Sequence, residues 1–205
     1  MAFNGFTSQD FGAFQIEGLD GRMEAIQSNI QPKFQEIGSE LVDYLQTLLG
    51  NEMFLHIAKH ARRTVNPPND TWLAVANNKR GYKKHPHFQV GLWDDRVFVW
   101  LAYIYELPNK EEMARVFLQH EGDLQEMLPR DFNISMNHMK KSDETVNDVE
   151  LDKVLDRFKR VKSAELLFGK QFAAQDPIIT DGPKFLQELK SVVDVLVPIY
   201  QLSLK

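Results

Sequence analysis

Apolar residues recur every three or four positions between about residues 20 and 49, which predicts a long helix with one buried face. Pro32 should kink or split this helix, because proline removes a backbone donor and crowds the preceding turn. Gly50 is expected to end it. The apolar positions are Met23, Ile26, Ile30, Phe34, Ile37, Leu41, Leu45 and Leu48.

The pattern then changes to short segments rich in Val, Ile, Phe, Trp and Tyr, which predict β-strands. Turn signals separate these segments: residues 66–70 contain two prolines, and Asp94-Asp95 predicts a tight hairpin. Because the links are short, the strands should pair antiparallel. The first segment is ambiguous, since its HIAKHA also permits one or two helical turns. The expected strands are 54–63, 71–77, 87–93 and 97–105.

The second half of the chain predicts further helices around this sheet. Asn109 should cap a helix, with Glu112 completing a capping box, and the buried stripe would be Met113, Val116, Phe117, Leu124 and Met127. A strand at 132–137 precedes a mobile polar loop at 138–148. Asn147 is expected to cap the next helix, whose buried face would be Leu151, Val154, Leu155, Phe158 and Val161.

A strand near 164–172 and a helix from about 183, which Pro198 bends or ends, complete the chain. Strands grouped together with helices around them predict an α+β fold, a curved antiparallel sheet packed on helices. The length of 205 residues, 43% of them hydrophobic, fits one globular domain over 1–205.

The chain contains no cysteine, which excludes disulfides, thiolate metal sites and cysteine nucleophiles. Its start lacks the basic and apolar regions of a signal peptide. No uninterrupted apolar stretch approaches the ~18 residues of a membrane span. We therefore expect a soluble protein in the cytoplasm that makes no contact with the membrane.

Charge is unevenly distributed. Seven cations and one acid, Asp70, lie between His56 and His87, which gives this segment a formal charge of +6. The whole chain has a formal net charge of −5, so the residues outside the segment sum to −11. A positive segment on an acidic protein favours an anionic partner. The seven cations are Lys59, Arg62, Arg63, Lys79, Arg80, Lys83 and Lys84.

This segment carries three motifs: KHARRTVNPPNDTW at 59–72, ANNKRGYK at 76–83 and PHFxxGLW at 86–93. The pattern DFxxFxIxGLxxRMxAI also occurs at 10–26. These motifs resemble those of the YktB-like family of uncharacterised proteins from Gram-positive bacteria, and the likeness extends over essentially the whole chain. The resemblance implies a TATA-binding-protein-like fold with a strongly curved antiparallel sheet. It implies no activity.

The leading hypothesis is a binding protein whose basic pocket holds a phosphorylated ligand, either a nucleotide-like metabolite or a short nucleic acid. Small alanines on the face of the 71–77 strand would leave room, and the 77–84 link would carry donors suited to phosphate. A pI of about 5.7 disfavours extensive DNA binding. The candidate ligand-binding residues are His60, Arg62, Arg63, Asn77, Lys79, Arg80, Tyr82, Lys83 and His87.

Three alternatives stay open. The cations could solvate a loop and pair with acids elsewhere, or dock an acidic protein partner. An enzyme could use His60 or His87 with Arg62 or Arg63, although no nucleophile elbow, P-loop or dinucleotide fingerprint occurs. We expect no metal or other cofactor, because the histidines lack a matching carboxylate pattern and seven cations would oppose another. Most aromatics should be core, with Tyr82 the most exposed.

Overall fold

The computed structural model describes residues 3–205, so residues 1 and 2 of the predicted domain lie outside the described part of the chain. Six strands form one sheet in the order β1-β2-β3-β4-β6-β5, and every pairing is antiparallel. This confirms the α+β class. The strands are β1 (Phe54–Ile57), β2 (Asp70–Ala76), β3 (His87–Trp93), β4 (Arg96–Tyr103), β5 (Asn133–Ser135) and β6 (Leu166–Ala173).

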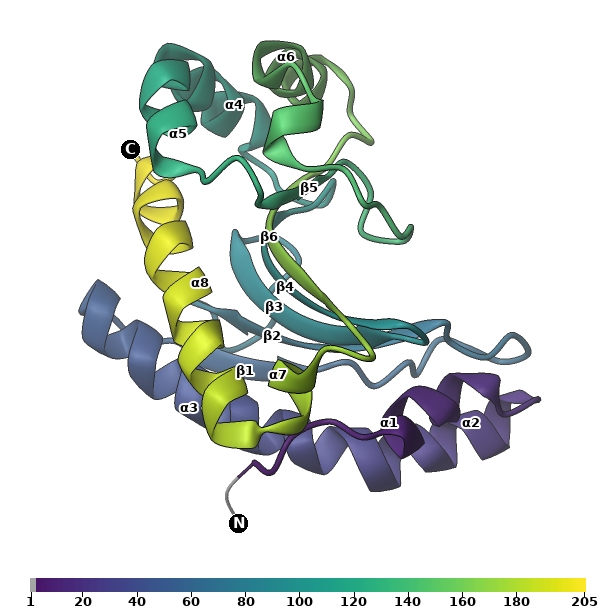
Figure 1. Cartoon of the computed structure of the whole chain (residues 1–205). Helices are drawn as coiled ribbons and strands as arrows, with labels where there is room; N and C mark the ends of the chain where they lie inside the picture. The colour runs from purple at the N-terminus through teal and green to yellow at the C-terminus, as the bar shows by residue number, and fades with distance from the viewer. Residues whose placement is uncertain (1–2) are drawn as a thin grey trace.

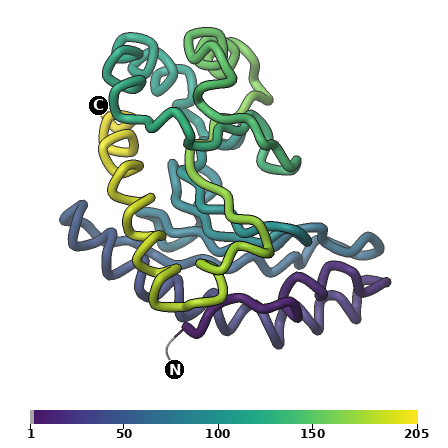
Figure 2. Tube along the Cα trace, in the orientation of Figure 1, coloured from purple at the N-terminus to yellow at the C-terminus, as the bar shows by residue number. Residues whose placement is uncertain are grey.

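The helices lie along one face of the curved sheet and at one end of it (Figure 1). α3 packs against β1 and β2, and α8 packs against β4 and β6 on the same face. α4, α5 and α6 gather at the end where α8 finishes, as the tube of Figure 2 shows. The helices are α1 (Ser8–Gly12), α2 (Leu19–Ala25), α3 (Gln31–Leu49), α4 (Lys110–Gln119), α5 (Glu121–Met127), α6 (Leu151–Arg160), α7 (Pro177–Thr180) and α8 (Gly182–Leu202).

The helix predicted at 20–49 is present, but it contains a π-helical segment, Ile26–Ile30, between α2 and α3. Pro32 follows this segment directly, within the first two residues of α3. The helix is therefore not split: the backbone stays right-handed helical from α2 into α3, and the irregularity before the proline is a π-helical turn. Gly50 ends α3 with a left-handed backbone, φ +71°, which glycine adopts without strain.

The strand predicted at 54–63 is wrong beyond Ile57. Pairing continues only as far as the Ala58 N–H, which donates to the Trp72 carbonyl at 2.9 Å. Its partner strand begins at Asp70, and the two prolines that precede it lack the N–H groups a longer ladder would need. His60 adopts φ +50°, so the chain turns away. His60 and Arg62 therefore lie outside the strand that carries His56.

The second half needs smaller corrections. His120 divides the helix predicted from Asn109 into α4 and α5, and no side-chain capping bond forms at Asn109. Glu150 rather than Asn147 precedes α6, and Val161 is 40% exposed instead of buried. α8 continues through Pro198 to Leu202. Residues 138–148 include a 3-10 turn, Val146–Asp148, and the mobility of this loop stays a prediction.

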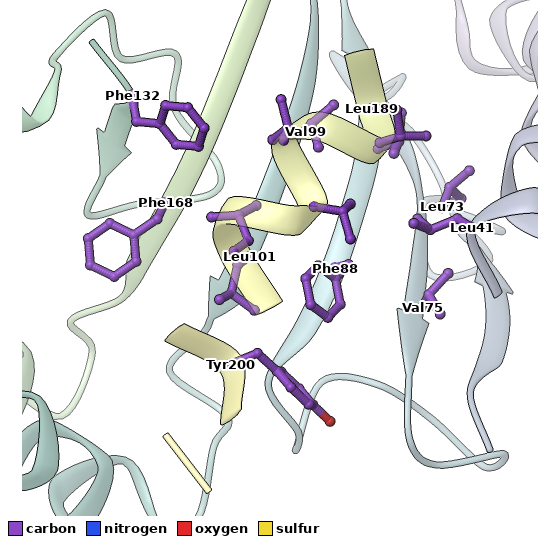
Figure 3. Packing of buried hydrophobic residues seen from close by; sticks show 14 of the residues in the cluster. Leu41, Leu73, Val75, Phe88, Val99, Leu101, Phe132, Phe168, Leu189 and Tyr200 are labelled. Atoms are coloured by element: carbon purple, nitrogen blue, oxygen red, sulfur yellow. The ribbon is translucent and has the colours of Figure 1, made fainter. Parts of the chain in front are cut away.

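The main core lies between the sheet and the helices. Figure 3 shows Leu189 and Tyr200 of α8 over Phe88, Val99 and Leu101 of the sheet. The rings of Tyr200 and Phe88 have centroids 5.3 Å apart. Burying such side chains contributes about 1.5–3 kcal/mol each, which fixes the sheet on its helices.

The opposite side of the sheet, here called the second face, carries a separate apolar cluster. It requires glycine at two positions: a Cβ on Gly91 would lie 2.2 Å from the Phe98 ring, and one on Gly169 would lie 1.8 Å from the Val99 carbonyl oxygen. Most of the aromatics are core, as predicted. The cluster contains Trp93, Phe98, Trp100, Ala102, Ile104 and Leu167, with Trp72 packed against it.

Within residues 3–205, no helix combines the length and the apolarity that crossing a membrane requires. The likeness to the TATA-binding-protein-like fold stays an expectation from the sequence motifs.

Candidate functional site

A basic groove of about 710 Å³ lies between β1 and the loop of residues 77–86 that joins β2 to β3. Its volume falls within the range of about 300–1,000 Å³ that is usual for ligand sites. Four of its side chains are cations and one is a carboxylate. The groove is lined by Leu55, His56, Ile57, Lys59, Asn78, Arg80, Gly81, Tyr82, Lys83, Lys84, His85 and Glu106.

Short-range hydrogen bonds fold the 77–86 loop back across the second face of the sheet. The Tyr82 hydroxyl accepts a hydrogen bond from the Trp72 indole at 2.9 Å, and the Tyr82 ring lies 4.9 Å from that of His87. The Asn78 side chain accepts from the Arg80 backbone N–H at 2.9 Å. Tyr82 is therefore half-buried as an anchor of the loop, and this burial raises its pKa.

Two histidines, His85 and His56, line the groove, and a hydrogen bond orients the ring of His56. Its Nε2 lies 2.9 Å from the Asn78 carbonyl oxygen, which can only accept, so Nε2 carries the proton. In the neutral ring Nδ1 is then an acceptor. Among residues 3–205 no hydrogen-bond partner for Nδ1 occurs.

The cations of the groove are mostly free of acidic partners. Lys83 pairs with Glu106 at 3.3 Å, and both side chains are substantially exposed, so this pair stabilises the loop by at most about 1 kcal/mol. The side chains of Lys59, Arg80 and Lys84 make no hydrogen bond or ion pair with any residue of 3–205. Counting its lysine, arginine and glutamate side chains, the groove therefore keeps a formal excess of three positive charges.

Three of the nine predicted ligand-binding residues line the groove: Arg80, Tyr82 and Lys83. The other six lie elsewhere, namely His60, Arg62, Arg63, Asn77, Lys79 and His87. Arg62, Asn77 and Lys79 are exposed, and within the described chain their side chains contact no partner. Arg63 donates to the carbonyls of Asn66 and Pro67, both at 3.3 Å, so it holds the 58–69 loop.

The two histidines considered as bases are held by interior contacts. His87 is fully buried, with Nδ1 2.7 Å from the His85 carbonyl oxygen and Nε2 2.8 Å from the Gln89 amide nitrogen, so both ring nitrogens are used. Burial lowers its pKa to about 4. Nε2 of His60 lies 3.1 Å from the Thr71 hydroxyl, and burial, with the charge of Arg63, lowers the pKa of His60 to about 4.

Several groove residues were not among the predicted binding residues. Lys59 and Lys84 belonged to the basic segment, so their charge was visible, but the sequence could not show that they face the same space as Arg80. Glu106 carried no signal, since it follows β4 in a polar turn. His56 was visible only as one of several histidines.

A second group of polar side chains, also not predicted, is buried near the second face. Glu165 accepts from the ring Nδ1 of His138 at 2.7 Å and from the backbone N–H of His138 at 2.8 Å. Burial alone would raise the pKa of Glu165, but the hydrogen bonds and charge of His138 lower it. Asp70 is 2% exposed, and burial raises its pKa to about 6 despite the positive charges of His138 and Arg63.

Comparison with known proteins places the chain in a family. Residues 6–200 match the family described as "Domain of unknown function (DUF1054)". The chain belongs to this family. Similar proteins are a UPF0637 protein of Shouchella clausii, 56% identical over 204 residues, and one of Oceanobacillus iheyensis, 54% identical over 201 residues. These alignments cover 100% and 98% of this chain and 97% of each relative.

A UPF0637 protein of Listeria monocytogenes is 48% identical over 205 residues and covers both chains completely. The relatives are uncharacterised proteins from Gram-positive bacteria, which confirms the assignment made from the sequence motifs. Membership of the DUF1054 family brings no substrate or reaction with it, so the function must be argued from the groove itself.

Proposed function

We propose that this DUF1054 protein binds a phosphorylated ligand in the groove between β1 and the 77–86 loop. The observation that carries the proposal is the set of Lys59, Arg80 and Lys84, which face one space and have no acidic partner in the described part of the chain. A phosphate group carries about −1.5 to −2 charges at pH 7 and offers three acceptor oxygens. Arginine can bind it with two parallel hydrogen bonds, and lysine as a point charge.

The competing explanation, that these cations only solvate the loop and pair with acids, is supported in the groove by the Lys83–Glu106 pair alone. Elsewhere some lysines do pair with acids, as Lys141 does with Asp94 and Asp95. Keeping three like charges together without counter-charges costs free energy, and an anionic ligand would offset that cost.

An enzyme that uses the groove remains the alternative. The hydrogen bonds of His60 and His87 argue against the bases first considered, and His56 replaces them as the candidate because its Nδ1 is an available acceptor. Turnover of phosphorylated compounds that depends on His56 would favour the enzyme over the binding protein. The cytoplasmic location stays a prediction from the sequence.

The proposal is tested by thermal shift and calorimetry with pyrophosphate, nucleotides, sugar phosphates, O-phosphoserine and short RNA. A ligand that binds the native state raises the melting temperature by mass action. Lys84→Ala should then weaken binding of the best compound about tenfold to a hundredfold, because a charge-assisted hydrogen bond contributes about 1.5–3 kcal/mol.

Lys79→Ala is the matched control, because it removes the same charge from the same loop at a residue outside the groove lining. Its binding should change by no more than about twofold, through long-range charge alone. Equal losses in the two variants would mean that only the net charge of the loop matters, and the groove would then have no role as a site. Arg62→Ala serves as a second control on the 58–69 loop.

A further inference from the structure

The groove has a feature that a phosphate alone would not use: one wall is the free edge of the sheet. β1 is the first strand in the sheet order, and within residues 3–205 it pairs only with β2. Three consecutive residues of this strand, Leu55 to Ile57, line the groove. An edge strand offers unpaired main-chain donors and acceptors to any extended chain that reaches it.

The register of β1 shows which main-chain groups point into the groove. The Ala58 N–H bonds to the Trp72 carbonyl, and the strands are paired with His56 opposite Ala74. Hydrogen-bonded and non-bonded pairs alternate along an antiparallel ladder. His56 therefore bonds to β2, whereas the N–H and C=O groups of Leu55 and Ile57 point away from it. Within residues 3–205 none of the main-chain hydrogen bonds outside the sheet engages these groups.

We infer that the ligand is an extended phosphoserine- or phosphothreonine-bearing peptide that adds a seventh strand beside β1, with its phosphate on Arg80, Lys84 and Lys59. This inference rests on the proposed phosphate site. Strand addition draws affinity from main-chain hydrogen bonds and specificity from side-chain contacts. Here the groove supplies both, because the cations of the 77–86 loop and Lys59 lie beside the free edge.

The charges decide between the possible occupants of the edge. A second copy of this chain, paired edge to edge, would bring two groups of uncompensated cations together and would be repelled. A phosphopeptide neutralises the same cations. A nucleotide or sugar phosphate would neutralise them as well, but it would leave the main-chain groups of Leu55 and Ile57 without partners.

The test starts from a pool of eight-residue peptides, acetylated and amidated, with phosphoserine fixed at the centre and the other positions degenerate. Peptides retained by the purified full chain are sequenced, and the best is resynthesised with N-methyl groups at either the odd or the even residues. Only alternate N–H groups of an added strand face β1. One methylated form should therefore bind at least about tenfold more weakly than the unmodified peptide, and the other within about twofold.

Equal behaviour of the two methylated forms, whether both bind or neither does, would overturn strand addition. So would a pool in which no peptide binds more tightly than free O-phosphoserine. In both cases phosphoserine binding that is lost in Lys84→Ala would leave the proposed phosphate site standing. If neither phosphoserine nor any of the other phosphorylated probes binds, the proposed function fails too.

A variant of the protein gives an independent readout. Ile57→Pro removes an N–H that points into the groove and takes part in no bond to β2, and proline is tolerated on edge strands. We expect it to weaken the peptide at least about tenfold more than it weakens O-phosphoserine, and equal losses for the two ligands would argue against strand addition. Far-UV circular dichroism and the melting temperature check its fold. If the variant fails to fold, the methylated peptides, which leave the protein unchanged, decide the question.

Discussion

Asp70 should make the protein less stable at neutral pH than its asparagine variant would be. The carboxyl group is 2% exposed, and within residues 3–205 its side chain makes no hydrogen bond or ion pair with another residue. Burial raises its pKa from 3.8 to about 6. A difference of about 2 pKa units corresponds to roughly 3 kcal/mol.

The direction of this effect on the free energy of unfolding follows from proton binding by the native and unfolded states. Below about pH 4 the carboxyl group is protonated in both states and costs no differential free energy. Between about pH 4 and pH 6 the unfolded state ionises while the native state stays protonated, so the free energy of unfolding falls as the pH rises. Asp70→Asn removes this loss and should stabilise the protein by about 1–3 kcal/mol at pH 7.5, since the buried amide keeps some desolvation cost of its own.

Urea unfolding of both proteins at pH 4.5 and 7.5 measures the effect, with the exposed Asp131→Asn as control. The advantage of Asp70→Asn should grow by about 2 kcal/mol between the two pH values, and the control should show almost none. A variant less stable than the wild type at pH 7.5 would refute the reasoning, because it would reveal an ionised carboxylate with a stabilising partner.

Two further predictions concern buried polar and backbone contacts. Lys110 donates to the carbonyls of Val161, Lys162 and Ala164 at 2.6–2.9 Å. Lys110→Met should therefore lower the unfolding free energy by about 3 kcal/mol, measured by the same urea denaturation. The control Lys153→Met, at an exposed lysine, should lower it by less than about 0.5 kcal/mol. Gly169→Ala would place a Cβ 1.8 Å from the Val99 carbonyl oxygen and should lower the unfolding free energy by at least about 1–3 kcal/mol. The control Gly122→Ala, where an added Cβ meets nothing within 4 Å, should raise it by about 0.5–1 kcal/mol. Equal melting temperatures of the two variants would contradict the crowding at Gly169.

The sheet could be predicted because the sequence signals for strands and turns lie among residues that are neighbours in the chain. Alternating apolar residues and short links indicated β1 to β4 and their antiparallel order, and the structure confirms both. The exception, residues 58–63, shows the limit of such patterns. Residues 54–63 were expected to form one strand, but whether a strand continues depends on its partner, and the partner begins only at Asp70.

The site was predictable only in part, because its residues meet through the fold. The basic segment identified the 77–86 loop, yet which of seven cations share one space depends on the turn at His60 and on the anchoring of Tyr82 to Trp72. His138 and Glu165 come from separate segments, and no spacing in the sequence relates them to each other. Long-range pairs of this kind leave no periodic signal.

The placement of acids gives the strongest reason to regard the basic groove as functional. The chain has 29 acidic and 24 basic residues, so counter-charges are abundant. Some of them pair with cations in the rest of the molecule, as Asp10 does with Lys33, Asp143 with Arg96 and Glu188 with Lys170. In the groove a single carboxylate faces four cations. What sets the groove apart is that three cations without an acidic partner among residues 3–205 gather in one space beside a free strand edge. We therefore expect this space, as proposed, to receive an anion from outside the chain.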